Sequence, residues 1–200
     1  MIRHRHSLSQ STSTMAAMVV LLLLGLLQLA VPGLAQSPPS GMVKIDSFTY
    51  SGSGCPPGSS GGVVSSDATT FTVVFDKYTA FSPESAADRR KNCQLSIGLT
   101  YPAGFVFTLE SVTFRGNSKG GEGSLAASYY FPGIPETVRL QRKLPPPTEG
   151  NFELTEKFLT FIYSPCGTES VKLYINFEAR VRGGSITVAS VDFRLLWKKC

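Results

Sequence analysis

Three consecutive cations, Arg89, Arg90 and Lys91, stand just before Cys93. Neighbouring guanidinium and ammonium groups can bind a sulfate, phosphate or uronate group through charge-assisted hydrogen bonds. A solvated loop tethered by a disulfide would show the same run, so both interpretations stay open. The run is the candidate binding patch for an anionic partner. Nothing in the sequence shows that it converges with the later cations Arg180, Arg182, Lys198 and Lys199.

Carboxylates are the other side chains with catalytic potential, because two of them at the right separation can act as acid and nucleophile of a glycosidase. The candidates are Asp76, Glu84, Asp88 and Glu110. The chain holds 14 acids, so pairs of this kind arise by chance, and no spacing rule selects among them. We assign no catalytic residue on this basis.

Histidine chemistry is excluded by position, because His4 and His6 lie in a segment that we expect to be removed. Catalytic triads need imidazole as a base, and zinc and copper sites favour its nitrogens. No DxDxDG-like calcium loop occurs either. The sequence therefore predicts no metal and no cofactor.

The N-terminal segment has the organisation of a secretory signal peptide, residues 1–35. Arg3 and Arg5 precede an apolar run over residues 15–31, and Gly33 and Ala35 supply the small residues before a cleavage site. A retained membrane anchor is the alternative, although the run is short for a span. Cleavage predicts a secreted, extracellular or wall-associated protein with no membrane contact. The net charge of +5, lowered by the loss of two arginines, is too small to indicate a nucleic-acid partner.

The four cysteines, Cys55, Cys93, Cys166 and Cys200, all follow the signal segment and would meet an oxidising compartment. Two disulfides are therefore expected, and four cysteines allow three connectivities. Pairing neighbours, Cys55 with Cys93 and Cys166 with Cys200, closes two loops of similar size and is preferred. A four-thiolate zinc site normally shows close CxxC pairs, which are absent.

Short segments of alternating apolar and polar residues, separated by Gly, Pro and Ser, predict strands. These are residues 43–50, 69–76, 93–100, 105–115, 124–131, 152–164, 171–182 and 185–197. Eight or nine strands in one domain, residues 42–200, predict an all-β fold, a two-sheet β-sandwich. Residues 36–41 are expected to be a flexible lead-in, and residues 81–91 and 132–150 long surface loops.

Several aromatic residues could stack on sugar rings if they were exposed on one face, although such residues more often fill a sandwich core. They are Tyr78, Tyr101, Tyr129, Tyr130 and Trp197. Tyr129 and Tyr130 must point to opposite faces of a strand, which predicts that one of them is exposed.

Five segments occur in a recognisable order: SGSGCPPGS, FTVVFDKYTAFSP, RRKNCQLSIGLTYPAGFVF, SPCG and LLWKKC. Together they resemble the fungal secreted proteins grouped as domain of unknown function 4360. The resemblance covers nearly all of the chain after the signal segment, and residues 117–150 follow it least. It implies a secreted, disulfide-stapled, β-rich protein with no established activity to carry over.

Two functions fit these observations. The first is a non-catalytic secreted protein that binds cell-wall polysaccharide or a host surface component, with residues 89–91 as its basic patch. The alternative is a carboxylate-dependent carbohydrate-active enzyme. The separation of the carboxylates in the folded protein discriminates between them, because a glycosidase pair lies roughly 5 to 10 Å apart.

Overall fold

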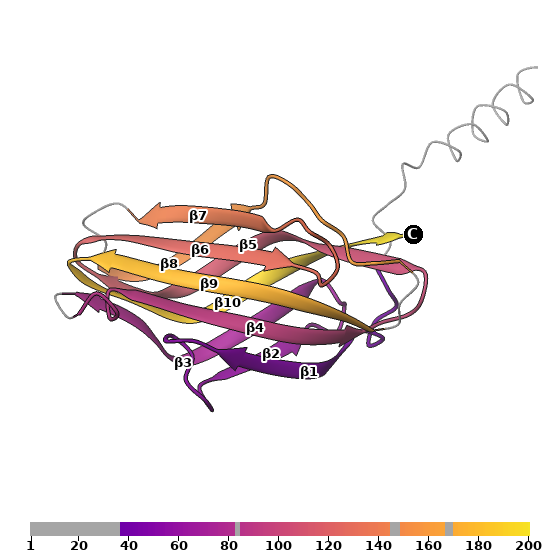
Figure 1. Ribbon diagram of the computed structural model, residues 1–200, viewed down its shortest axis with the longest axis horizontal. Helices are drawn as coiled ribbons and strands as arrows, with labels where there is room; N and C mark the ends of the chain where they lie inside the picture. The colour runs from indigo at the N-terminus through magenta and orange to yellow at the C-terminus, as the bar shows by residue number, and fades with distance from the viewer. Residues whose placement is uncertain (1–36, 83–84, 145–148, 167–169) are drawn as a thin grey trace, which may run out of the picture. The chain divides into compact units, whose positions relative to one another are not determined.

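The computed structural model describes residues 37–82, 85–144, 149–166 and 170–200. They form two antiparallel sheets of five strands each, a β-sandwich as predicted (Figure 1). No helix in this part of the chain is long and apolar enough to cross a membrane. The expected signal peptide, residues 1–35, and the carboxylate of Glu84 fall outside the described residues.

The two sheets interleave strands from distant parts of the chain. Sheet A has the order β1 (Lys44–Ser51), β4 (Arg90–Thr100), β9 (Ser170–Arg182), β6 (Glu122–Tyr130) and β7 (Val138–Leu144). Sheet B has the order β2 (Ser60–Val64), β3 (Thr70–Ser82), β10 (Gly184–Lys199), β5 (Phe105–Lys119) and β8 (Glu149–Lys157).

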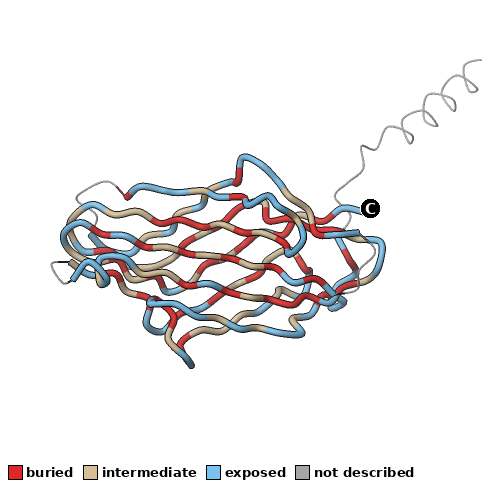
Figure 2. The backbone as a smooth tube through the Cα atoms, in the orientation of Figure 1, coloured by how far each residue is buried: buried red, intermediate tan, exposed pale blue. Residues whose placement is uncertain are grey.

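Alternation of side chains builds the core between the sheets, as β9 shows. Its odd-numbered residues from Val171 to Ala179 are buried, whereas the side chains between them point outward. A strand with one buried and one wet face is what an antiparallel sheet on a core requires. Figure 2 shows the same alternation of buried and more exposed residues along the strands.

Most aromatic residues singled out in the sequence belong to this core. Tyr78, Tyr101, Tyr129 and Trp197 are each no more than 2% exposed, so they cannot stack on a ligand at the surface. The Trp197 indole donates a hydrogen bond to the Ala68 carbonyl at 2.7 Å, which satisfies its one polar group. Tyr130 alone of the five is partly exposed.

Both disulfides join the neighbours that the sequence analysis prefers, Cys55 with Cys93 and Cys166 with Cys200. Their Cα atoms are 5.5 and 5.9 Å apart, within the ordinary range. The first one holds the β1–β2 loop against β4. Gly54 lies in that loop against the Tyr78 ring, where an added Cβ would stand 2.2 Å from a ring carbon.

Two expectations need correction. The sandwich has ten strands, because β7 runs through the predicted loop 132–150 and the glycine-rich β2 carries almost no strand signal. The predicted loop 81–91 is also shorter, since β3 continues to Ser82 and β4 begins at Arg90. At Ser40 and Gly41, the Ser40 hydroxyl and the Gly41 amide both donate to the Ser66 carbonyl.

Candidate functional site

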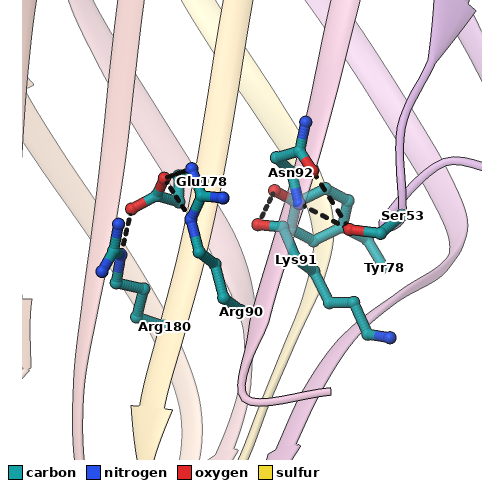
Figure 3. A network of polar contacts seen from close by, with 7 residues as sticks. All are labelled: Ser53, Tyr78, Arg90, Lys91, Asn92, Glu178 and Arg180. Carbon is teal, nitrogen blue, oxygen red and sulfur yellow. Dashed lines mark hydrogen bonds and ion pairs between the residues drawn. The ribbon is translucent and has the colours of Figure 1, made fainter. Parts of the chain in front are cut away.

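The cationic run divides at the start of β4, because successive side chains of a strand point to opposite faces. Arg90 points outward from sheet A, directly across from Arg180 on β9. Lys91 points the other way and pairs with Asp88 at 2.9 Å. Figure 3 shows the Lys91 side chain directed away from the Glu178 group. The predicted three-residue patch is therefore reduced to Arg89 and Arg90.

Cations from three segments of the chain converge on one open hollow of about 600 Å³ in the outer face of sheet A. Its positively charged lining residues are Arg89, Arg90, Lys143, Arg180 and Arg182. Glu122 is the one carboxylate among the described lining residues. We call this region the basic hollow. Its excess of positive charge favours an anionic ligand.

The strand register explains why these residues meet. Arg90 on β4 lies opposite Arg180 on β9, which lies opposite Ser124 on β6, which lies opposite Lys143 on β7. Four strands thus contribute one row across sheet A, with a small residue in its middle. The small Ser124 leaves space between the arginines on one side and the lysine on the other.

Glu178 fixes two of the arginines at the edge of the basic hollow. Arg90 donates hydrogen bonds to its carboxylate at 2.6 and 2.8 Å, and Arg180 donates to the other oxygen (Figure 3). Partial burial disfavours the charged carboxylate, but the hydrogen bonds from Arg180 and Arg90 outweigh it, so the pKa of Glu178 lies below its ordinary value. The carboxylate orders the two guanidiniums and competes with an incoming anion for them.

A second, smaller hollow of about 190 Å³ continues from the first along the same face and shares Arg90 with it. Its floor includes Ala126 and Ser128 of β6, and its sides include Asn176 on β9 and Arg139 on β7. We call it the amide hollow, after the side-chain amides of Asn92 and Asn176 that line it. Such groups both donate and accept hydrogen bonds and suit uncharged hydroxyls.

The row beyond the amide hollow holds two tyrosines. Tyr130 on β6 lies directly opposite Tyr174 on β9, and their rings are stacked with centroids 5.0 Å apart and planes 7° apart. Both residues are partly exposed on the outer face. The two rings form an exposed aromatic surface on which a sugar ring could stack. Tyr130 is one of the five aromatic residues singled out in the sequence, whereas Tyr174 is not.

The candidate carboxylates lie elsewhere. Asp76, Asp88 and Glu110 line neither hollow. Asp88 is paired with Lys91, which together with the Ser85 hydroxyl lowers the pKa of its carboxyl group. Glu110 is paired with Arg194 on the outer face of sheet B at 2.9 Å.

Two of the later cations join the site and two do not. Arg180 and Arg182 line the basic hollow, whereas Lys198 lies over the Tyr163 ring, 3.5 Å from its centroid. Lys143 was missed because its strand was interpreted as a loop. The alternation of Val138, Leu140 and Leu144 with charged residues was the signal that could have found it.

Three kinds of comparison place the chain among known proteins. The family model described as "Domain of unknown function (DUF4360)" matches residues 41–200. An "Uncharacterized secreted protein" of Arthroderma benhamiae is 33% identical over an alignment 187 residues long, which covers 84% of this chain and 76% of that protein. This relative and the two disulfides confirm the prediction of a secreted protein.

Among solved structures, the chain is similar to TmCBM61 in complex with β-1,4-galactotriose, with 13% identity and a TM-score of 0.34 over 78% of this chain and 90% of that one. It is also similar to the xylan-binding module CBM15, with 14% identity and a TM-score of 0.33 over 76% and 95%. Scores this low carry no inference about a ligand.

Proposed function

The chain belongs to the family of domain of unknown function 4360, and we propose that it is a secreted binding protein that holds an acidic polysaccharide of a cell wall or host surface in the basic hollow. One observation carries the proposal. Five cations, carried by β7, by β9 and by the start of β4 with the residue before it, line an open hollow in which Glu122 is the one carboxylate among the described lining residues. A uronate or sulfate group accepts charge-assisted hydrogen bonds from arginines in this arrangement.

The ionic state of the hollow supports binding rather than hydrolysis. A glycosidase acid needs a raised pKa so that it holds its proton near neutral pH. Glu178 has a lowered pKa instead and is ionised there. Glu122 lies four residues farther along the register, which separates the two backbone positions by about 13 Å at the usual rise per residue.

The proposal is tested by incubating the oxidised protein, lacking residues 1–35, with polygalacturonate, chitin and neutral β-glucan. Bound protein and released sugar are measured in the same tubes. We expect binding to polygalacturonate, no release of sugar, and weaker binding as salt screens the charges. Release of sugar, or equal binding to the neutral polymers, would overturn the proposal.

A pair of matched variants links binding to the hollow. Arg89→Ser with Arg182→Ser removes two lining cations and is expected to weaken binding about fivefold, since each exposed charge contributes a fraction of a kcal/mol. Lys77→Ser with Lys157→Ser removes two exposed cations of sheet B and leaves the hollow intact. Equal loss in both variants would show a dependence on net charge and no site.

A further inference from the structure

The outer face of sheet A offers more than an anion-binding hollow, because three features follow one another along β6. The basic hollow surrounds Ser124, the amide hollow surrounds Ala126 and Ser128, and the tyrosine pair begins at Tyr130. We define the β6 furrow as this row of outward-facing β6 residues from Ser124 to Tyr130 with its flanking side chains on β9 and β7.

Resting on the proposed function, we infer that the ligand is a polysaccharide chain that lies lengthwise in the β6 furrow, with an acidic group in the basic hollow and a pyranose ring against the Tyr130–Tyr174 pair. The ligand class is thus a linear glycan with uronate or sulfate groups. An isolated anion would occupy only one end.

The length of the furrow supports a chain. Tyr174 and Arg180 are six residues apart on β9, which corresponds to about 20 Å at the usual rise of a strand. A single sugar is far shorter than that. The two hollows meet at Arg90, and two residues that line the amide hollow, Ser128 and Asn176, each stand two positions from a tyrosine of the pair.

The side chains that line the furrow change in kind from one end to the other, and each kind suits a different part of an acidic sugar chain. The basic end carries guanidinium and ammonium groups, and the far end carries two phenol rings. The middle carries the uncharged Asn92, Asn176 and Ser128 beside the charged Arg139 and Glu178. Amides and hydroxyls bind sugar hydroxyls, and aromatic rings pack on the apolar face of a pyranose.

The small residues of β6 at the floor of the furrow leave room for a ligand chain to lie along it. Ala126 stands between Glu178 on β9 and Gln141 on β7, and its methyl group leaves a gap between these longer side chains. Small Ser96 on β4 stands opposite Tyr174 on the side away from Tyr130. A bulky side chain at position 126 would divide the furrow between its basic end and its tyrosine end.

The experiment measures the affinity of oligogalacturonates from disaccharide to octasaccharide by isothermal titration calorimetry. We expect affinity to rise with length until the furrow is filled. A double variant, Tyr130→Thr with Tyr174→Thr, keeps good strand formers and is expected to lose about five- to tenfold for the octasaccharide but little for the disaccharide. Ala126→Trp is expected to produce the same pattern, whereas Thr155→Trp, a matched control on β8, leaves all affinities unchanged.

The outcomes separate the two proposals. Affinity that does not change with length, or tyrosine variants that bind the octasaccharide like the wild type, would overturn the furrow while leaving anion binding in place. Polyphosphate that binds as tightly as the octasaccharide and is unaffected by the tyrosine variants would overturn it as well. Failure of every acidic oligosaccharide to bind would overturn the proposed function itself.

Discussion

The outer faces of the two sheets are both formed by five antiparallel strands, but they differ in how far their cations are paired with carboxylates. On sheet B, Arg115 is shared between Asp192 and Glu153, and Arg194 is paired with Glu110. Each of these two cations therefore has a carboxylate partner on its own face. On sheet A, Glu178 pairs with two of the five cations that line the basic hollow, and no ion pair within the described residues holds the other three, Arg89, Lys143 and Arg182.

The polar residues differ in the same way. On sheet B, outward-facing hydroxyls and amides form hydrogen bonds with one another across neighbouring strands. Thr113 bonds with Thr155 at 2.8 Å, and Asn117 bonds with Asn151 at 3.1 Å. In the amide hollow, Asn176 and Ser128 face open space. A face whose polar groups satisfy each other stabilises the sheet, whereas a face with unbalanced charge and an open hollow is suited to a partner.

The largest expected effect comes from reversing one charge on each face. Arg180→Glu places a carboxylate in the basic hollow and is expected to weaken polygalacturonate binding at least about tenfold, through lost attraction and new repulsion. Arg194→Glu makes the same change beside Glu110 on sheet B and is expected to leave binding unchanged. Affinity is measured by calorimetry, and melting temperatures check the fold. Equal losses of affinity in the two variants would contradict the functional difference between the two faces.

A smaller effect of opposite sign is expected from neutralising the carboxylate that competes with the ligand. Glu178→Gln frees Arg90 and Arg180 for an anion and is expected to strengthen binding about threefold, a fraction of a kcal/mol. Glu110→Gln frees Arg194 on the other face and serves as the matched control. Weaker binding by the Glu178→Gln variant would show that ordering of the arginines matters more than competition.

The same carboxylate predicts a modest dependence of stability on pH. Because the pKa of Glu178 is lowered by folding, its contribution is present above the unfolded-state value and is lost as pH falls through the lower folded-state value. Between about pH 6 and about pH 3, wild type should therefore lose up to about 1 kcal/mol more unfolding free energy than Glu178→Gln. Urea unfolding at both pH values measures this, and parallel losses would contradict it.

The framework of the protein was accessible from the sequence because it depends on local patterns. Alternation in residues 171–182 predicted β9, and spacing favoured the disulfides that the structure contains. The weak strands were missed for a physical reason: β2 is built on glycines, and β7 lies between proline-rich segments. Both are edge strands, whose pattern is weaker because only part of one face is buried.

The site was less accessible because it is made by register rather than by sequence neighbours. The run of residues 89–91 lies at the edge of the basic hollow, yet strand alternation directs the Lys91 side chain away from it. Lys143 and Tyr174 reach the site only through the pairing of β6 with β7 and β9. Sequence spacing cannot show which residues four strands bring into one row.

The smallest expected effects come from placing a valine at one outward-facing position on each sheet. Thr113→Val removes a hydrogen bond on exposed sheet B, and Ser128→Val adds methyl groups to the floor of the amide hollow. Valine suits a strand, so each unfolding free energy should change by no more than about 0.5 kcal/mol. Only Ser128→Val should weaken octasaccharide binding, about twofold, because it narrows the furrow and removes a hydroxyl. If Thr113→Val weakened binding as much, the ligand would have to contact sheet B, and the two faces would no longer be functionally distinct.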